Sequence, residues 1–238
     1  MKVAALLTGR GNNTLKDKNI LPVLGKPLLT YPAMAAKRVD AISSFYISSD
    51  DDEILCAAEG CGYQKIVRPK ELATPDAKHI DTIFHAVNYL QEYSGFRPDI
   101  LVVLLANSAT VKSEWIEEGI RLITEDPSIS AAVPVYKEQD HHPFRAKRLN
   151  SEGNLDTFFD FKDQEVSTNR QELEPCYFLC HNFWVLNLQK SLFAEGGQKP
   201  WVFLGNKTKP ILVEESFDVH TEYDILRSER WLRANNIA

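Results

Sequence analysis

Short apolar runs alternate along this chain with stretches of helical periodicity, and this alternation restricts the fold more than any other feature of the sequence. Apolar runs with the length of buried strands lie at 3–7, 44–48, 99–106, 130–135, 183–186 and 210–213. Apolar residues recur at helical spacing in 28–38, 53–59, 80–93, 115–123 and 222–232. This order predicts an α/β fold with a mostly parallel sheet and covering helices. We expect the most apolar run, 99–106, near the middle of the sheet.

The length and composition fit a single globular domain over 1–238. Of the 238 residues, 44% are hydrophobic and 25% are charged, which is enough to bury a core without metal or disulfide support. The pattern loosens between about 136 and 173, where charged residues and a turn at 150–153 predict an inserted lobe. The formal net charge of −6 argues against the basic surface that nonspecific nucleic-acid binding requires.

The sequence shows no targeting or membrane segment. The apolar run after Lys2 is too short for the core of a signal peptide, and no stretch approaches the roughly 20 apolar residues of a membrane helix. The 4 cysteines lie in a chain that is large enough to fold unaided, so reduced thiols are expected. These features predict a cytoplasmic protein that binds neither a membrane nor nucleic acid.

A glycine-bearing, cation-rich loop follows the first apolar run. It extends from Thr8 to Asn19 and carries Arg10, Lys16 and Lys18. Glycines such as Gly11 allow backbone N–H groups to approach phosphate oxygens, while the cations neutralise phosphate charge. The loop contains neither the Walker nor the dinucleotide-binding fingerprint. It is suited to holding a triphosphate, and a solvated turn of the same composition is the alternative.

A second chemical signal lies near the C-terminus, where Asp218 and His220 are two residues apart. Residues at this spacing on an extended strand point to the same side, so both could hold one divalent cation. A carboxylate suits Mg²⁺, whereas an imidazole prefers a softer ion or hydrogen-bonds to a ligand, which keeps Mn²⁺ as an option. The same segment also fits the start of a helix that is capped by Asp218 or Thr221.

Taken in order, the motifs resemble those of the acylneuraminate cytidylyltransferases, also called CMP-sialic acid synthetases. The resemblance covers nearly the whole chain and rests on the RG loop, the KN pair, GKPLL, YISSDDDEI, RPKELA, HHPF, NRQ and SFDVHTEYD. It implies a Rossmann-like α/β nucleotidyltransferase with helices on both faces of the sheet. It also implies that CTP and a 2-keto sugar acid react, with Mg²⁺, to give a CMP-sugar and pyrophosphate. A homodimer is implied as well, formed through the inserted lobe.

The resemblance assigns roles in nucleotide binding to particular residues. Lys16 takes the place of the family's loop lysine, and His79 replaces a small hydroxyl residue near the ribose. Arg10 and Lys16 are expected to act on the triphosphate during catalysis. The full set of expected nucleotide contacts is Arg10, Gly11, Lys16, Lys18, Asn19, Arg68 and His79.

Other positions are implied to bind the acceptor and the metal. Arg170, followed by Gln171, matches a family arginine that lies near the sugar acid and phosphate on the dimer-forming lobe, and a catalytic role is expected for it. Asp218 and His220 occupy the positions of the family's Asp-x-Asp metal pair.

Three departures from the family pattern fall where the acceptor is chosen. A glutamine that usually touches the sugar acid is Ala106 here, so Asn107 or Ser108 is expected to supply the polar contact. An asparagine-glycine pair is lost in 177–184, and the second metal aspartate is His220. We therefore predict a cytidylyltransferase with an altered sugar-acid acceptor. The alternatives are a 3-deoxy-octulosonate type of acceptor, a sugar phosphate, or a non-catalytic nucleotide-binding relative.

Overall fold

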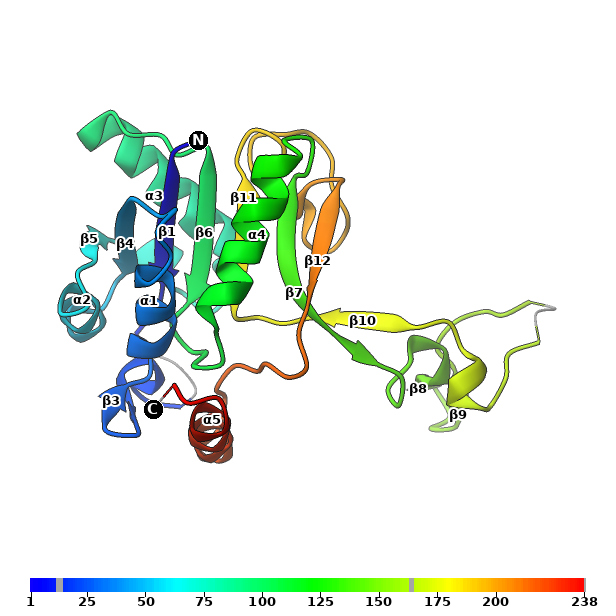
Figure 1. Ribbon diagram of the computed structural model, residues 1–238. Coiled ribbons are helices and arrows are strands. Elements are labelled where there is room, and N and C mark those ends of the chain that lie inside the picture. The colour runs from blue at the N-terminus through cyan, green and yellow to red at the C-terminus, as the bar shows by residue number, and fades with distance from the viewer. Residues whose placement is uncertain (12–14, 163–164, 238) are drawn as a thin grey trace.

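The computed structural model describes residues 1–11, 15–162 and 165–237 (Figure 1). In these residues eight strands form one mixed sheet in the order β10-β7-β11-β6-β1-β4-β5, with β12 also paired to β7. The strands are β1 (Val3–Thr8), β4 (Ser44–Ser49), β5 (Gln64–Val67), β6 (Ile100–Leu105), β7 (Ala131–Glu138), β10 (Cys176–Leu179), β11 (Phe183–Asn187) and β12 (Thr208–Leu212). The α-helices are α1 (Thr30–Lys37), α2 (Asp52–Glu59), α3 (His79–Ser94), α4 (Ser113–Glu125) and α5 (Glu222–Ala234).

The strand directions confirm the predicted α/β fold. Strands β1, β4, β5 and β6 run parallel to one another, and β12 runs parallel to β7. Strand β11 is antiparallel to both β6 and β7, and β10 is antiparallel to β7. Strand β6 lies between β1 and β11, which confirms the expected central place of the most apolar run.

Helices cover both faces of this sheet (Figure 1). Alternate residues of β1 point to opposite faces, because the side-chain period of a strand is two residues. Ala5 and Leu7 pack in a core with residues of α1, α2 and α4, whereas Ala4 and Leu6 pack in a second core with residues of α3. A third, smaller cluster joins α5 to the short hairpin of β2 (Pro22–Val23) and β3 (Lys26–Pro27). None of the described helices is long and apolar enough to cross a membrane.

Side chains of acidic segments fix where two helices begin. The Asp51 carboxylate accepts hydrogen bonds from the backbone N–H groups of Glu53 and Ile54, at 2.9 and 3.1 Å, and so starts α2. Thr221 and Asp224 form a capping box at the start of α5. Capping by Thr221 was one of the two alternatives for this segment, whereas Asp218 does not cap the helix.

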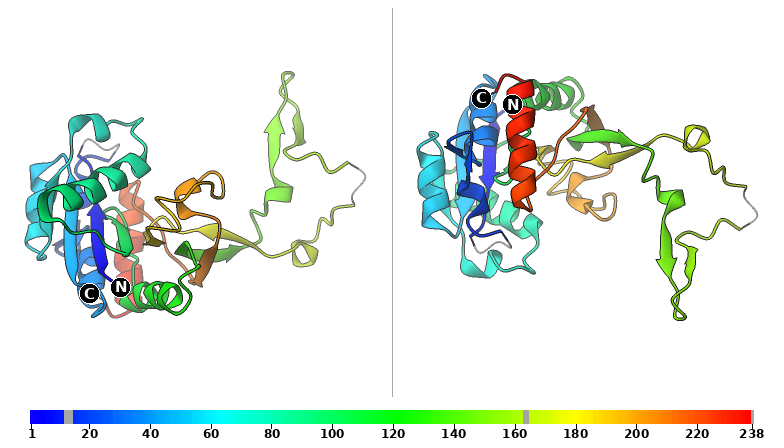
Figure 2. Two further views of the ribbon diagram at one scale, coloured as in Figure 1. Left: turned by 90° about the horizontal axis from the view of Figure 1, so that it is seen from above. Right: turned by 90° about the horizontal axis from the view of Figure 1, so that it is seen from below.

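The described residues of 139–175, here called the arm, project from the body of the protein beyond the ends of β7 and β10 (Figure 2). The arm contains a hairpin of β8 (Lys147–Leu149) and β9 (Leu155–Thr157) and two 3₁₀ turns, η3 (Pro143–Arg145) and η4 (Arg170–Glu172). The turn predicted at 150–153 joins the two hairpin strands. The arm overlaps the segment 136–173 in which an inserted lobe is predicted, and β7 continues to Glu138 before the arm departs.

Candidate active site

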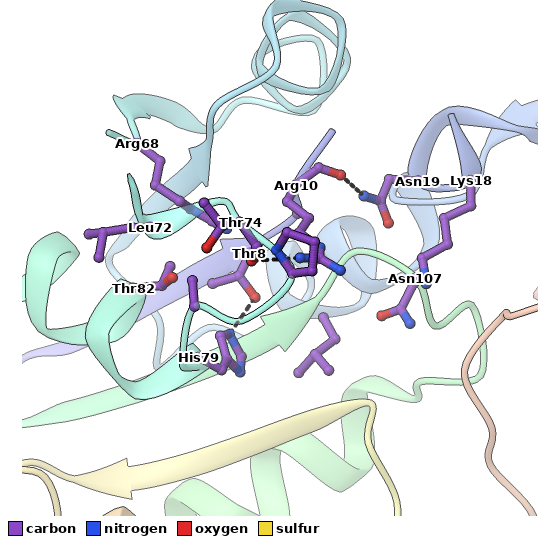
Figure 3. A pocket seen from close by; sticks show the side chains of 14 residues that line it. Thr8, Arg10, Lys18, Asn19, Arg68, Leu72, Thr74, His79, Thr82 and Asn107 are labelled. Carbon is purple, nitrogen blue, oxygen red and sulfur yellow. Dashed lines mark hydrogen bonds between the residues drawn. The ribbon is translucent and has the colours of Figure 1, made fainter. Parts of the chain in front are cut away.

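A cleft of about 290 Å³ opens at the carboxyl ends of three parallel strands. Strand β1 delivers Thr8, Gly9 and Arg10, the segment after β5 delivers Arg68, and the segment after β6 delivers Asn107. The carboxyl end of a parallel sheet is where open α/β folds bind their ligands. Figure 3 shows side chains from these segments facing one another across the cleft. The other residues that line it are Lys18, Asn19, Leu72, Thr74, Pro75, Ala77, His79, Thr82 and Leu105.

The loop after β1 is held close to the strand ends. A Cβ atom on Gly9 would lie 3.1 Å from the Ala106 side chain and 3.2 Å from that of Ile54, so this position has little room for a side chain. The buried Asn19 amide donates to the Arg10 carbonyl at 2.9 Å and ties the two ends of the loop together. Residues 12–14, which belong to the predicted phosphate-binding loop, lie outside the described residues.

Three cationic side chains, Arg10, Lys18 and Arg68, converge in the cleft, where Arg10 disfavours the charged forms of the other two. Burial lowers the pKa of Lys18, Asp218 opposes that shift, and Arg10 adds to it. Burial also lowers the pKa of Arg68 to about 10, against the effect of Asp50 and with a contribution from Arg10. A site in which cations disfavour each other gains stability when a polyanion enters it. The cleft is therefore suited electrostatically to a triphosphate.

Hydrogen bonds hold these cations in place. Arg68 is 6% exposed and donates to both the hydroxyl and the carbonyl of Ser48, at 3.2 and 2.6 Å. Arg10 donates to the Thr74 carbonyl at 2.8 Å. The Asp50 carboxylate accepts from the backbone N–H of Gly11 at 3.1 Å, which connects the loop after β1 to the segment after β4. The guanidinium groups are thus oriented before any ligand arrives.

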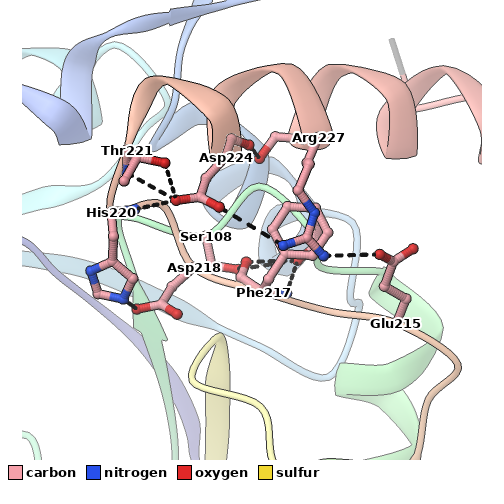
Figure 4. Close-up of polar contacts among 10 residues, drawn as sticks. Ser108, Glu215, Phe217, Asp218, His220, Thr221, Asp224 and Arg227 are labelled. Carbon is pink, nitrogen blue, oxygen red and sulfur yellow. Dashed lines mark hydrogen bonds and ion pairs between the residues drawn. The ribbon is translucent and has the colours of Figure 1, made fainter.

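Residues 213–221, here called the strap, connect β12 to α5 and contact the segment after β6 (Figure 4). The hydroxyl groups of Ser108 and Thr110 donate to the Phe217 carbonyl at 2.8 and 3.0 Å. The Val219 N–H donates to the Asn107 carbonyl at 2.8 Å. These bonds place Asp218 beside Asn107, whose amide donates to Asp218 Oδ2 at 3.2 Å.

The two predicted metal residues lie together on the strap. His220 Nε2 is 2.8 Å from Asp218 Oδ2 (Figure 4). An ionised carboxylate can accept hydrogen bonds but cannot donate them, so His220 Nε2 carries the hydrogen of this contact. The His220 side chain is 66% exposed, whereas that of Asp218 is 24% exposed. Within the described residues no cluster of three or more His, Cys, Asp or Glu residues could hold a metal by itself.

Comparison with known proteins decides the family. A family model described as Cytidylyltransferase matches residues 9–155, which include the loop after β1 and most of the cleft. The chain belongs to the cytidylyltransferase family. The predicted nucleotidyltransferase is thereby confirmed at the level of the family.

The chain covers very different shares of the known proteins that it resembles. The chain is 27% identical over 169 residues to an N-acylneuraminate cytidylyltransferase of Escherichia coli, covering 71% of this chain but only 39% of that protein. It is 24% identical over 244 positions to a CMP-N,N'-diacetyllegionaminic acid synthase of Legionella pneumophila, covering 100% of this chain and 99% of that protein. The solved structure of a CMP:2-keto-3-deoxy-manno-octonic acid synthetase complexed with CTP shares the fold, with a TM-score of 0.71 at 14% identity, over 99% of this chain and 100% of that chain.

Several residues expected in the site of this cytidylyltransferase lie elsewhere. Ser108 is fully buried and its hydroxyl binds the strap, so the expectation that it contacts substrate is wrong for this geometry. The Lys16 side chain is 92% exposed, lies 3.9 Å from Asp17 and does not line the cleft. Arg170 and Gln171 lie on the arm, where Arg170 pairs with Asp140, and neither lines the cleft of its own chain.

Sequence reasoning missed two groups that help to build the cytidylyltransferase cleft. Asp50 holds the Gly11 N–H, and its place directly after a predicted strand was a usable signal. Thr74 offers its backbone carbonyl to Arg10, and no sequence pattern identifies a role that depends on a carbonyl. The residues that the structure does bring to the cleft are Arg10, Lys18, Asn19, Arg68, His79 and Asn107.

Proposed function

We propose that this protein transfers CMP from CTP to a 2-keto sugar acid of the sialic or nonulosonic acid class, with release of pyrophosphate. The observation that carries the proposal is the convergence of Arg10, Lys18 and Arg68 in one cleft at the carboxyl ends of β1 and β5. The relative that aligns over its full length is named for a CMP-legionaminic acid product, which supports an acceptor of this class.

The cations divide the cleft into two ends. Lys18 and Asn19 lie at one end of the cleft (Figure 3). Arg68, Leu72 and Thr82 lie at the other end, and Arg10 lies between the two groups. The triphosphate occupies the end near Lys18 and Arg10, where ammonium and guanidinium groups neutralise its charge. The nucleoside then extends toward Arg68.

In the transfer step, the anomeric 2-hydroxyl oxygen of the acceptor attacks the α-phosphorus in line with the leaving group. A new P–O bond forms as the bond between the α-phosphorus and the bridging oxygen to the β-phosphorus breaks, and the proton of the attacking hydroxyl passes to solvent water. Arg10 and Lys18 stabilise the charge that develops on the leaving pyrophosphate. Their fixed positions also reduce the entropy lost in orienting the triphosphate.

A divalent cation fits this site through one carboxylate. Mg²⁺ at nucleotide sites is usually held by one or two carboxylates together with substrate phosphates and water, so a single Asp218 is sufficient. Asp218 Oδ2 is engaged by Asn107 and His220, which leaves Oδ1 to face the ion. His220 donates to Asp218 and thereby orients it, and it is not needed as a direct ligand. When bound, Mg²⁺ or Mn²⁺ supplies charge neutralisation of the phosphates.

The protein acts as a homodimer in this proposal. The β8–β9 hairpin has only three residues in each strand, and Leu149 and Leu155 face each other across it, both 70% exposed. A two-stranded hairpin alone is only marginally stable in water, and exposed apolar clusters commonly mark contact surfaces. The arm of one copy therefore packs on the other and brings Arg170 to the acceptor end of that copy's cleft. The free thiols of all four cysteines, among the described residues, fit a cytoplasmic location.

Pyrophosphate release tests the proposal directly. The protein is incubated with each of the four NTPs, with Mg²⁺ or Mn²⁺, and with a panel of sialic, legionaminic, pseudaminic and 3-deoxy-octulosonic acids. Release with CTP and a nonulosonic acid is the expected result. Release only with a 3-deoxy-octulosonic acid would show that the acceptor is of the 3-deoxy-octulosonate type instead. CTP binding without release from any acceptor contradicts the proposed transfer and favours a nucleotide-binding relative.

A further inference from the structure

His79 lies at the nucleoside end of the proposed CTP site. It is the first residue of α3 and lines the cleft on the side of Arg68 and Thr82, away from Lys18 and Asn107 (Figure 3). On this side of the cleft the guanidinium of Arg68 can only donate hydrogen bonds. A side chain that accepts a hydrogen bond at this position would therefore favour ligands that carry a matching hydrogen-bond donor.

The hydrogen bonds of Thr8 determine which ring nitrogen of His79 carries hydrogen. Thr8 Oγ1 lies 3.1 Å from the Leu104 carbonyl and 3.0 Å from His79 Nε2. The hydroxyl has one hydrogen, and the carbonyl can only accept it. Both contacts are satisfied only if His79 donates from Nε2 to the hydroxyl oxygen. The hydrogen-bond network thus assigns the Nε2–H tautomer, in which Nδ1 holds a lone pair.

The surroundings keep this imidazole neutral and fixed. Burial, with Arg68 and His181 nearby, lowers the pKa of His79 to about 4. The ring packs against Trp184, with the ring centroids 5.2 Å apart at 52°. Nδ1 has no hydrogen-bond partner within the described residues, and it is the polar atom of the ring that remains for a ligand.

We infer that His79 determines nucleotide specificity by accepting, at Nδ1, a hydrogen bond from a hydroxyl or amino group of the nucleoside bound in the cleft. The inference rests on the proposed function, which puts a nucleoside at this end. It identifies Nδ1 of His79 as the atom that contacts the nucleoside and makes this atom the acceptor of the hydrogen bond. The donor is either a ribose hydroxyl or the cytosine amino group, because these are the donors that a cytidine nucleotide carries.

Two substitutions test the two ring nitrogens of His79 separately. His79→Gln keeps a donor at the place of Nε2 for Thr8 and removes the acceptor, whereas His79→Asn keeps an acceptor at the place of Nδ1 and loses the contact with Thr8. His85→Gln is the matched control, because His85 lies on the same helix and does not line the cleft. Dissociation constants are measured by calorimetry for CTP, 2′-deoxy-CTP, 3′-deoxy-CTP and UTP, which lacks the amino donor.

The expected result is a selective loss of discrimination. His79→Gln weakens CTP binding by about 3- to 10-fold, as for one neutral hydrogen bond, and leaves binding of the analogue that lacks the recognised donor unchanged. His79→Asn and His85→Gln retain the preference of the wild type for CTP over that analogue. Unchanged preferences among all four nucleotides in His79→Gln would overturn the inference while leaving the proposed function intact. Failure of the wild type to bind CTP would overturn both.

The tautomer can be tested without any ligand. In protein labelled with ¹⁵N-histidine, long-range ¹H–¹⁵N correlation at pH 7 should show a protonated Nε2 and an unprotonated Nδ1 for His79. Added CTP should move the Nδ1 resonance upfield, and the analogue that lacks the donor should not. A proton on Nδ1 in the free protein would refute the assignment regardless of the outcome with nucleotides.

Discussion

The amide of Asn107 and the carboxylate of Asp218 are hydrogen-bonded at 3.2 Å although 111 residues separate them in the chain. This bond joins the end of the central strand β6 to the strap. It holds Asp218 near Lys18, whose pKa the carboxylate raises against the lowering by burial. A side chain of the segment after β6 therefore positions the proposed metal carboxylate near the cation that is proposed to bind phosphate.

Removing the Asn107 amide should impair the transfer reaction without unfolding the protein. We expect Asn107→Ala to lower kcat/KM by about 3- to 30-fold, because Asp218 loses one of the two donors that orient it. The half-saturating Mg²⁺ concentration should rise in parallel. Steady-state kinetics at several Mg²⁺ concentrations checks this, with circular dichroism as the control for folding. Wild-type kinetics in the variant would show that the bond does not orient Asp218 for catalysis.

Loss of the Arg10 guanidinium should abolish most of the activity. A charge-assisted contact to the triphosphate contributes about 1.5–3 kcal/mol, so we expect Arg10→Ala to reduce CTP affinity and turnover by at least about tenfold. Arg121→Ala is the matched control, because Arg121 is half-exposed on α4 and pairs with Glu118 and Glu125. Equal effects of the two substitutions would remove the loop after β1 from the mechanism.

Replacing His220 by a second carboxylate should strengthen metal binding. His220→Asp places two carboxylates on the strap, and more ligand charge increases the affinity for a hard cation. We expect about a tenfold lower Mg²⁺ concentration at half-maximal activity, with His220→Asn as the uncharged control. Loss of activity at every Mg²⁺ concentration in His220→Asp would mean that the histidine has a role of its own.

The neutral state of His79 should make stability depend on pH in a defined interval. In the unfolded chain the imidazole takes up a proton below its ordinary pKa of 6.5, whereas in the folded protein it does so only near 4. The unfolded state binds more protons between these values, so the free energy of unfolding should fall as the pH decreases from 6.5 to about 4. Urea titrations over this range should show a shallower decline for His79→Gln than for the wild type. Identical slopes would contradict the lowered pKa.

Charges on the hairpin of the arm should dissociate the proposed dimer. Leu149→Asp combined with Leu155→Asp alters two side chains that are 70% exposed in one chain, so the fold of the body should not change. Sedimentation velocity should show a shift from dimer to monomer, with loss of activity as Arg170 leaves the partner's cleft. Tyr93→Ser, at a residue that is 69% exposed on α3, is the control. A wild type that sediments as a monomer at all concentrations would contradict the dimer.

Much of the sheet could be predicted because its central strands are continuous apolar runs. Val3–Thr8 and Ile100–Leu105 are almost entirely buried, and burial on both faces leaves a clear signal in the sequence. Strand β5 was missed because in Gln64–Val67 only Ile66 is fully buried and the strand lies at the edge. Strand β10 is only partly buried, which leaves a weak signal in the sequence.

The candidate site was less predictable, because side-chain direction at the end of a strand depends on distant segments. Asn107 and Ser108 are neighbours and were equally plausible contacts, yet one lines the cleft and the other binds the strap. That choice is made by the Phe217 carbonyl, more than 100 residues away, which captures the Ser108 hydroxyl. The role of Arg68 was predicted only from the family resemblance, because an arginine after a short edge strand carries no signal of its own.

The strap is attached mainly by side-chain hydrogen bonds of Asn107, Ser108, Thr110 and Asn182 and by single backbone bonds at Val213 and Val219, whereas the neighbouring strands are paired by continuous ladders. Segments held in this way open by local unfolding at lower cost than the sheet, so amide exchange should be faster at Val219 than at Leu104. Equal exchange rates would show that the strap opens only with the sheet. Since Asp218 lies on the strap, one such opening moves its carboxylate away from Asn107. In the proposed reaction, the metal carboxylate would then be withdrawn by a local movement that leaves the sheet unchanged.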